Sequence, residues 1–97
     1  MKISEPNIKD FTVYTKKECK YCEIVKQTLT ENNLFFSVIQ CDDYLLENKD
    51  EFLKFIENKI GQVHKTFPMV FYEGKFLGGS IETTIFVDKL KSFDDIF

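Results

Sequence analysis

The chain of 97 residues contains no arginine and no tryptophan, so every one of its basic residues is a lysine. Thirteen lysines stand against sixteen acidic residues, which gives a formal charge of −3. Proteins that bind nucleic acid need clustered cations to neutralise phosphates, and no basic run is present here. The composition therefore argues against a nucleic-acid partner. The absence of arginine alone predicts no function.

Long hydrophobic runs are also missing. No uninterrupted apolar stretch exceeds about four residues, one of them being Met69–Tyr72, whereas a membrane-spanning helix needs about 20. Met1–Asp10 lacks the apolar core of a secretory signal. We therefore expect a soluble, cytoplasmic protein, without a membrane partner and monomeric.

Cysteine is scarce, with three residues, too few for a fold stapled by disulfides. Such staples are not needed, since 97 residues with 43% apolar content and eleven phenylalanines can bury a core. We expect one domain over residues 1–97. Cys19 and Cys22 form a C-x-x-C pair, and Cys41 stands alone. In a cytoplasmic chain such a pair is either redox-active or part of a metal site.

The hydrophobic periodicity predicts alternating strands and helices, without repeats or linkers. Strands are expected at Phe11–Tyr14, Leu34–Gln40, Met69–Tyr72 and Lys75–Leu77, and helices at 22–32, Leu45–Ile60 and Ile81–Leu90. About twenty residues separate the first two strands, which suits a helical crossover and parallel pairing. Glu73-Gly74 suits a tight hairpin turn. The order β-α-β-α-β-β-α predicts an α/β fold: a mixed four-stranded sheet flanked by three helices, with helices on both faces.

Three details of the helices can be predicted. Gly61 follows the second helix at the position where glycine ends helices. Ser80 is expected to cap the third helix. The core side of that helix is expected to comprise Ile81, Ile85, Phe86 and Leu90.

The C-x-x-C pair is expected where the first strand leads into the first helix. At i and i+3 on a helical turn the two Cα atoms lie ~5–6 Å apart, within the range of a disulfide. The partial positive charge of a helix start favours a thiolate, and cysteines in this setting have pKa values of ~3.5–7.5 in place of ~8.5. We expect Cys19 to be the accessible nucleophile and Cys22 to lie deeper.

Three lysines surround this helix start, where acids are ordinarily preferred: Lys16, Lys17 and Lys20. Such lysines make sense if an anion is held there. The alternative is a solvated face, because Glu18 and Glu23 reduce the charge of residues 16–23 to +1.

Three motifs together resemble those of the glutaredoxins of the dithiol type, a branch of the thioredoxin fold. They are Tyr14–Cys22 (YTKKECKYC), Thr66-Phe67-Pro68, and Gly78–Glu82 (GGSIE). The resemblance spans about residues 10–92. It implies a thioredoxin-like fold and a glutathione-dependent oxidoreductase that reduces protein disulfides and glutathione mixed disulfides, with Cys19 and Cys22 as the catalytic pair.

The resemblance also implies a binding site for glutathione, the reducing cosubstrate. A cis peptide is expected between Phe67 and Pro68, with the backbone of Phe67 pairing with the cysteinyl part of glutathione. Lys16 is similar to the lysine that holds the glycyl carboxylate, and Glu82 stands where relatives have an aspartate for the γ-glutamyl ammonium. The implied glutathione-binding residues are Lys16, Tyr21, Thr66, Phe67, Pro68, Gly79, Ser80, Ile81 and Glu82.

Other functions remain open at this stage. A zinc site could combine the three cysteines with His64, although their spacing is unusual for zinc, and no metal is expected. The alternative function is a glutathione-assisted [2Fe–2S] carrier, as some glutaredoxins are; members dedicated to it usually have Cys-Gly-Phe-Ser, which this chain lacks. Thioredoxin itself is disfavoured because no tryptophan precedes Cys19. Lys20 replaces the proline most common between the two cysteines of the family.

Overall fold

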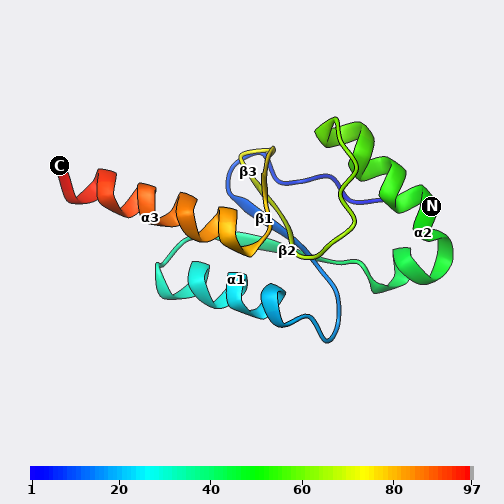
Figure 1. Cartoon of the computed structure of the whole chain (residues 1–97), viewed down its shortest axis with the longest axis horizontal. Helices are drawn as coiled ribbons and strands as arrows, with labels where there is room; N and C mark the ends of the chain where they lie inside the picture. The colour runs from blue at the N-terminus through cyan, green and yellow to red at the C-terminus, as the bar shows by residue number, and fades with distance from the viewer. Residues whose placement is uncertain (97) are drawn as a thin grey trace.

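A four-stranded mixed sheet carries helices on both of its faces in the computed structural model of the chain (Figure 1). The structure describes the backbone of residues 1–96 and the side chains of residues 1–92. The elements are β1 (Phe11–Thr15), α1 (Lys20–Glu31), β2 (Phe36–Gln40), α2 (Asp42–Ile60), β3 (Met69–Tyr72), β4 (Lys75–Gly78) and α3 (Ser80–Ile96). This order, and the mixed sheet with three helices, confirm the fold predicted from the sequence.

Strand β1 lies at the centre of the sheet, whose order is β2-β1-β3-β4. It pairs in parallel with β2, as the length of the crossover predicts, and antiparallel with β3. Strands β3 and β4 form a hairpin at Glu73-Gly74, where both residues have positive φ values of 51° and 81°. Two such residues are the mark of the tight hairpin turn that was predicted.

The side chains of β1 alternate between the two faces, and each face has its own core. Phe11 and Val13 pack with Val25 and Leu29 of α1 and with Val87 of α3. Tyr14 points to the opposite face, where its buried neighbours come largely from α2 and β3. In Figure 1, α1 and α3 lie side by side on one side of the sheet and α2 lies on the other.

Helix α1 buries Cys22, Val25 and Leu29, which lie at helical spacing and confirm the helix predicted over this segment. The helix begins at Lys20, two residues before the predicted start, because Cys19 already serves as its N-cap. Strand β2 begins at Phe36 and not at Leu34. The backbone N–H of Leu34 still bonds to the carbonyl of Leu29 (3.0 Å) and so belongs to the end of α1.

Helix α2 begins at Asp42, earlier than predicted, and is kinked at Asn48, whose φ and ψ are −160° and 85°. The Asn48 carboxamide oxygen accepts a hydrogen bond from the N–H of Glu51 (3.0 Å), so it caps the second part of the helix. Leu46, two residues before the kink, is an apolar residue of this helix that is 83% exposed. Gly61 ends the helix with a φ of 80°, as predicted.

The predicted core face of α3 is wrong in part. Ile81 and Ile85 are 70% and 50% exposed, whereas Val87 is buried and Phe86 and Leu90 pack against the core as predicted. Ile81 and Ile85 lie on the side of the helix away from Val87 and Leu90, and packing against α1 and the sheet buries the side with Val87. Ser80 is the first helical residue and not the cap, since the N–H of Thr83 bonds to the carbonyl of Gly79 (3.1 Å).

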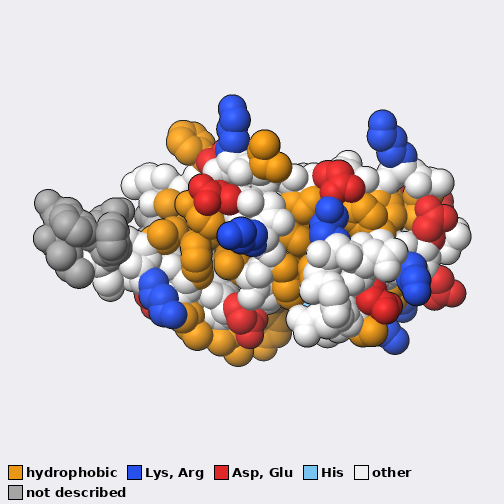
Figure 2. All heavy atoms as spheres, turned by 90° about the horizontal axis from the view of Figure 1, so that it is seen from above, with side chains coloured by type: hydrophobic (Ala, Val, Ile, Leu, Met, Phe, Trp, Pro, Cys, Tyr) orange, Lys and Arg blue, Asp and Glu red, His pale blue; other side chains and the backbone are white. Residues whose placement is uncertain are grey.

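The surface carries charges of both signs, as the composition of the sequence predicts. Figure 2 shows lysine and acidic side chains interspersed on the face seen there, with hydrophobic side chains between them. Among the described residues, none of the helices combines the length and the apolar character needed to cross a membrane.

Candidate active site

Cys19 is the N-cap of α1 and its sulfur occupies the capping position. Its backbone is extended (φ −117°, ψ 102°), and its Sγ accepts a hydrogen bond from the backbone N–H of Cys22 at 3.3 Å. The first N–H groups of a helix have no intrahelical partner, so a capping side chain satisfies one of them. Here the sulfur takes the place of the usual Ser or Asp oxygen, directly in the positive field of the helix start.

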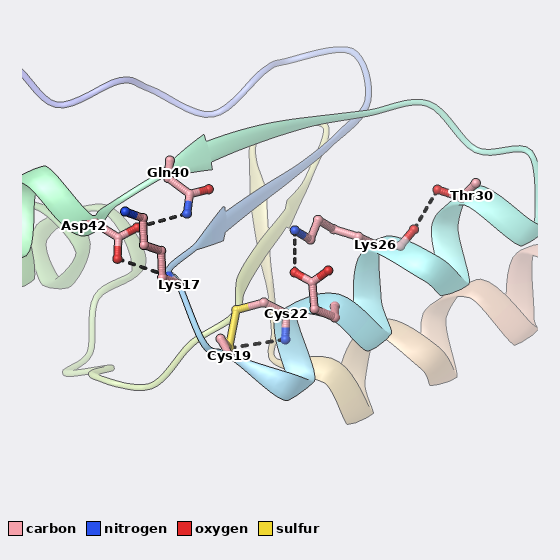
Figure 3. A network of polar contacts seen from close by, with 8 residues as sticks. Lys17, Cys19, Cys22, Lys26, Thr30, Gln40 and Asp42 are labelled. Atoms are coloured by element: carbon pink, nitrogen blue, oxygen red, sulfur yellow. Dashed lines mark hydrogen bonds and ion pairs between the residues drawn. A yellow bond between two sulfur atoms is a disulfide. The ribbon is translucent and has the colours of Figure 1, made fainter.

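Cys19 and Cys22 are joined by a disulfide, which Figure 3 shows at the start of α1. Their Cα atoms are 5.2 Å apart, as the i, i+3 spacing predicts. Cys22 is fully buried and Cys19 is 9% exposed. Of the two sulfurs, that of Cys19 is therefore the one that another thiol can reach.

One side of Cys19 opens into a charged hollow of about 550 Å³. Its lining residues come from the β1–α1 loop, α1 and the end of β2: Lys16, Lys17, Glu18, Cys19, Lys20, Glu23, Lys26 and Gln40. Within it, Lys26 forms an ion pair with Glu23 at 2.6 Å (Figure 3). The predicted cluster of lysines thus lines the same hollow as Cys19, together with acids that offset part of its charge.

A groove of about 400 Å³ collects most of the residues that the family resemblance implies for glutathione. It is lined by Tyr21, Thr66, Phe67, Pro68, Gly79, Ser80, Ile81 and Glu82. These are eight of the nine residues implied, and they come from α1, the loop before β3 and the start of α3. The exposure of Ile81, which departs from the predicted core face, is what places it in this groove.

The ninth residue, Lys16, does not line the groove itself but contacts Phe67, which does. Its Nζ lies 5.7 Å from the centre of the Phe67 ring, within the range of a cation–π contact. The peptide bond between Phe67 and Pro68 is cis, as the resemblance implies. Among the described residues, no hydrogen bond engages the backbone N–H of Phe67.

Glu82 folds back over the start of α3. Its Oε1 accepts a hydrogen bond from the N–H of Gly79 (2.8 Å), which is one half of a capping box. Gly78 makes this possible: its φ is 132°, and a Cβ there would lie 2.8 Å from the side chain of Glu82. The groove therefore ends at one carboxylate and at the first N–H groups of a helix, which can face an ammonium and a carboxylate respectively.

Asp42, at the start of α2, fixes the loop that carries the lysines, a role that the sequence analysis did not predict. Its two carboxylate oxygens accept hydrogen bonds from the N–H of Lys17 (3.1 Å) and from Nε2 of Gln40 (2.9 Å), as Figure 3 shows. The bond from Lys17 is the main cause that lowers the pKa of Asp42 below its ordinary value. Acidic residues are common in the first turn of helices, so the presence of Asp42 at this position does not by itself predict a contact with Lys17.

Cys41 and His64 pack against residues other than the two cysteines of the disulfide. Cys41 is fully buried on the α2 face, and burial raises its pKa to about 12. A thiol in that state is no nucleophile at neutral pH. The His64 ring packs edge-on against Phe76 with 5.0 Å between ring centres. In the part of the chain that the structure describes, no three His, Cys, Asp or Glu side chains form a group that could hold a metal.

Comparison with known proteins gives one family. The glutaredoxin family model matches residues 11–77. Human mitochondrial glutaredoxin-2 is 30% identical over 71 residues, which are 73% of this chain and 41% of the relative. Glutaredoxin 1 of Rickettsia conorii is 33% identical over 67 residues, 69% of this chain and 61% of the relative. The chain thus spans about two fifths to three fifths of the length of these curated relatives.

Solved structures give the same result. Glutaredoxin 1 from Francisella tularensis, complexed with cacodylate, has a TM-score of 0.72 at 28% identity and covers 84% of this chain and 95% of its own. The buckwheat glutaredoxin–glutathione complex has a TM-score of 0.63 at 28% identity, with coverage of 78% and 66%. With its C-x-x-C pair at the start of α1 and a family match over two thirds of its length, the chain belongs to the glutaredoxin family.

Proposed function

We propose that this protein is a glutathione-dependent thiol–disulfide oxidoreductase that reduces protein disulfides and glutathione mixed disulfides. The observation that carries the proposal is the placement of Cys19. Its sulfur caps α1, is the more exposed of the disulfide pair, and lies in a chain whose groove collects eight of the implied glutathione-binding residues. Membership of the glutaredoxin family supports the thiol–disulfide chemistry, and a neighbour solved as a glutathione complex supports the choice of thiol.

The first step is attack by the Cys19 thiolate on one sulfur of the substrate disulfide. A bond forms between Cys19 and that sulfur, the substrate S–S bond breaks, and its electron pair leaves with the second sulfur as a thiolate. The rate of such an exchange rises with the thiolate fraction of the attacking group. The N–H of Cys22 and the helix field both favour the anionic form of Cys19, so they prepare it for this attack.

The mixed disulfide on Cys19 is then resolved in one of two ways. With a protein substrate, the Cys22 thiolate attacks Cys19 Sγ, the bond between Cys19 and the first substrate sulfur breaks, and that sulfur leaves as a thiolate while the disulfide of this structure forms. Two glutathiones then reduce it and leave as glutathione disulfide. With a glutathione mixed disulfide, a second glutathione attacks the glutathione sulfur on Cys19 directly, and Cys22 is not needed.

The groove supplies groups of the right chemistry for each part of glutathione. The γ-glutamyl end carries an ammonium and a carboxylate, which suit the Glu82 carboxylate and the free N–H groups at the start of α3. The N–H of Phe67 suits the cysteinyl peptide group, as strand-like pairing does in peptide recognition. Lys16, beside Phe67, suits the glycyl carboxylate.

The experiment that tests the proposal is a coupled assay with glutathione and glutathione reductase, run on two variants. Cys19→Ser should abolish turnover of a glutathionylated peptide, because the other two thiols, of Cys22 and Cys41, are fully buried. Cys22→Ser is the matched control and should retain that activity while losing the reduction of a protein disulfide. Substantial turnover by Cys19→Ser would refute the assignment, and loss of both activities in Cys22→Ser would make Cys22 structural.

A further inference from the structure

Thr15, the last residue of β1, has a buried hydroxyl that the fold leaves without a partner. Its side chain is 1% exposed. Among the described residues, Thr15 Oγ1 is the one buried side-chain oxygen or nitrogen atom that has no hydrogen-bond partner. A buried hydroxyl without a bond is destabilising, so such groups in native proteins call for an explanation. Thr12 of the same strand shows the normal case, because its hydroxyl accepts the N–H of Asn7 at 2.8 Å.

The alternation of β1 places Thr15 on the face of the sheet that α1 covers. Phe11 and Val13, four and two residues earlier, pack with Val25 and Leu29 of α1. Thr15 follows the same alternation and therefore points to the same face. Cys41 belongs to the other core, together with Tyr14, so its thiol is not on the side of the Thr15 hydroxyl.

The direction of the chain places Thr15 level with the disulfide. Strand β1 and helix α1 run in opposite directions, as consecutive elements of a βαβ unit do. Leu29, Val25 and Cys22 therefore follow one another toward the end of β1, just as Phe11 and Val13 lead to Thr15. Gln40, which pairs with Thr15 across the sheet, lines the same hollow as Cys19. This pairing also indicates that Thr15 lies at the end of the sheet where the disulfide is.

We infer that the Thr15 hydroxyl is the hydrogen-bond donor that awaits the sulfur of Cys22 when the disulfide is opened. This inference rests on the redox role proposed above for the Cys19–Cys22 pair. In this oxidised form Thr15 Oγ1 has no hydrogen bond, to Cys22 Sγ or to any other described atom. A thiolate is a strong acceptor, and hydrogen bonds to an ionised group are about twice as strong as neutral ones.

The step concerned is the reduction of the disulfide. An incoming thiolate attacks Cys19 Sγ and forms a new S–S bond, the bond between Cys19 and Cys22 breaks, and the electron pair stays on Cys22 Sγ. That sulfur is fully buried, so its charge is without water and needs a donor inside the protein. Thr15 therefore makes Cys22 a better leaving group and, by the same bond, favours the reduced protein at equilibrium.

The test is the equilibrium of each protein with reduced and oxidised dithiothreitol at pH 7. Thr15→Val keeps the shape of the side chain and removes the hydroxyl. It should lower the equilibrium constant for reduction about tenfold, which is about 30 mV toward a more negative potential for a two-electron couple. Thr15→Ser restores the donor and should stay within about twofold of the wild type, as should Thr12→Val, which removes a buried hydroxyl from the other face. An unchanged potential in Thr15→Val overturns the inference.

Two further measurements separate this role from a merely structural one. Oxidised Thr15→Val should unfold at the same or a higher temperature than the wild type, whereas Thr12→Val should unfold lower; a large loss in oxidised Thr15→Val would mean that the hydroxyl is already bonded, against the inference. In a crystal structure of the reduced wild type, Thr15 Oγ1 should lie within hydrogen-bond distance of Cys22 Sγ, and a longer separation would refute it. Dithiothreitol needs no glutathione groove, so this test stands even where the proposed dependence on glutathione fails.

Discussion

The backbone N–H of Cys22 donates a hydrogen bond to the sulfur of Cys19, with 3.3 Å between nitrogen and sulfur. Cys22, the proposed resolving cysteine, thus contacts Cys19, the proposed nucleophile, through its backbone N–H as well as through the disulfide. The bond does not depend on the disulfide, because it belongs to the N-cap geometry of α1. We expect it to persist after reduction, when a thiolate on Cys19 accepts it more strongly.

Lys16→Ala should weaken the binding of glutathione without slowing the chemical step. The ammonium of Lys16 lies beside Phe67 at the edge of the groove, and its removal takes away one exposed ion pair, roughly 1 kcal/mol. The KM for a glutathionylated peptide should rise about fivefold at low salt, with kcat nearly unchanged. Lys75→Ala, which removes the same charge from the β3–β4 hairpin, is the control. Equal KM values for both variants and the wild type would exclude Lys16 from the site.

Asp42→Asn should destabilise the protein only where the carboxylate is ionised. The folded pKa of Asp42 lies below its ordinary value of 3.8, mainly because of the N–H of Lys17. Its contribution is therefore present above the unfolded pKa and is lost as the pH falls through the folded one. Urea midpoints of wild type and variant should differ at pH 7 and converge below about pH 4. Asp43→Asn, in the same first turn of α2, should show a smaller difference at pH 7; a gap that is independent of pH would contradict the role of the charge.

Val87→Ala and Ile85→Ala should have unequal effects on stability. Val87 is buried between the sheet and α1, and shortening it should cost about 2 kcal/mol of unfolding free energy. Ile85 is half exposed, and its shortening should change the free energy by less than about 0.5 kcal/mol. Chemical denaturation of both variants measures this difference. A larger loss of unfolding free energy for Ile85→Ala than for Val87→Ala would mean that the helix face predicted from the sequence is the buried one.

Much of the fold could be predicted because local signals agreed. The spacing of Cys22, Val25 and Leu29 gave the buried face of α1, and Glu73-Gly74 gave the hairpin. The spacing of apolar residues did not predict the buried face of a helix correctly where apolar residues lie on more than one side of that helix. In α3 apolar residues lie on more than one side of the helix, and the packing against α1 and the sheet buries the side with Val87 and leaves Ile81 exposed. In α2 the kink at Asn48 changes the phase in the middle of a regular pattern.

The groove residues could be named from three separate motifs, but the contacts that hold them could not. The bond from Gly79 to Glu82 depends on the backbone of Gly78, and the clamp of Asp42 on Lys17 joins residues 25 positions apart. The unpartnered hydroxyl of Thr15 is likewise invisible in a sequence. A β-branched residue at the end of a strand is common, and only the surrounding atoms show that its oxygen has no partner.

The most direct test is the ionisation of Cys19 in the reduced Cys22→Ser variant, followed by the ultraviolet absorbance of the thiolate. Cys41 does not interfere, since burial raises its pKa to about 12. The N-cap position and the helix field predict a pKa of Cys19 within about 3.5–7.5, in place of about 8.5 for a free thiol. A value near that of the free thiol would contradict the account.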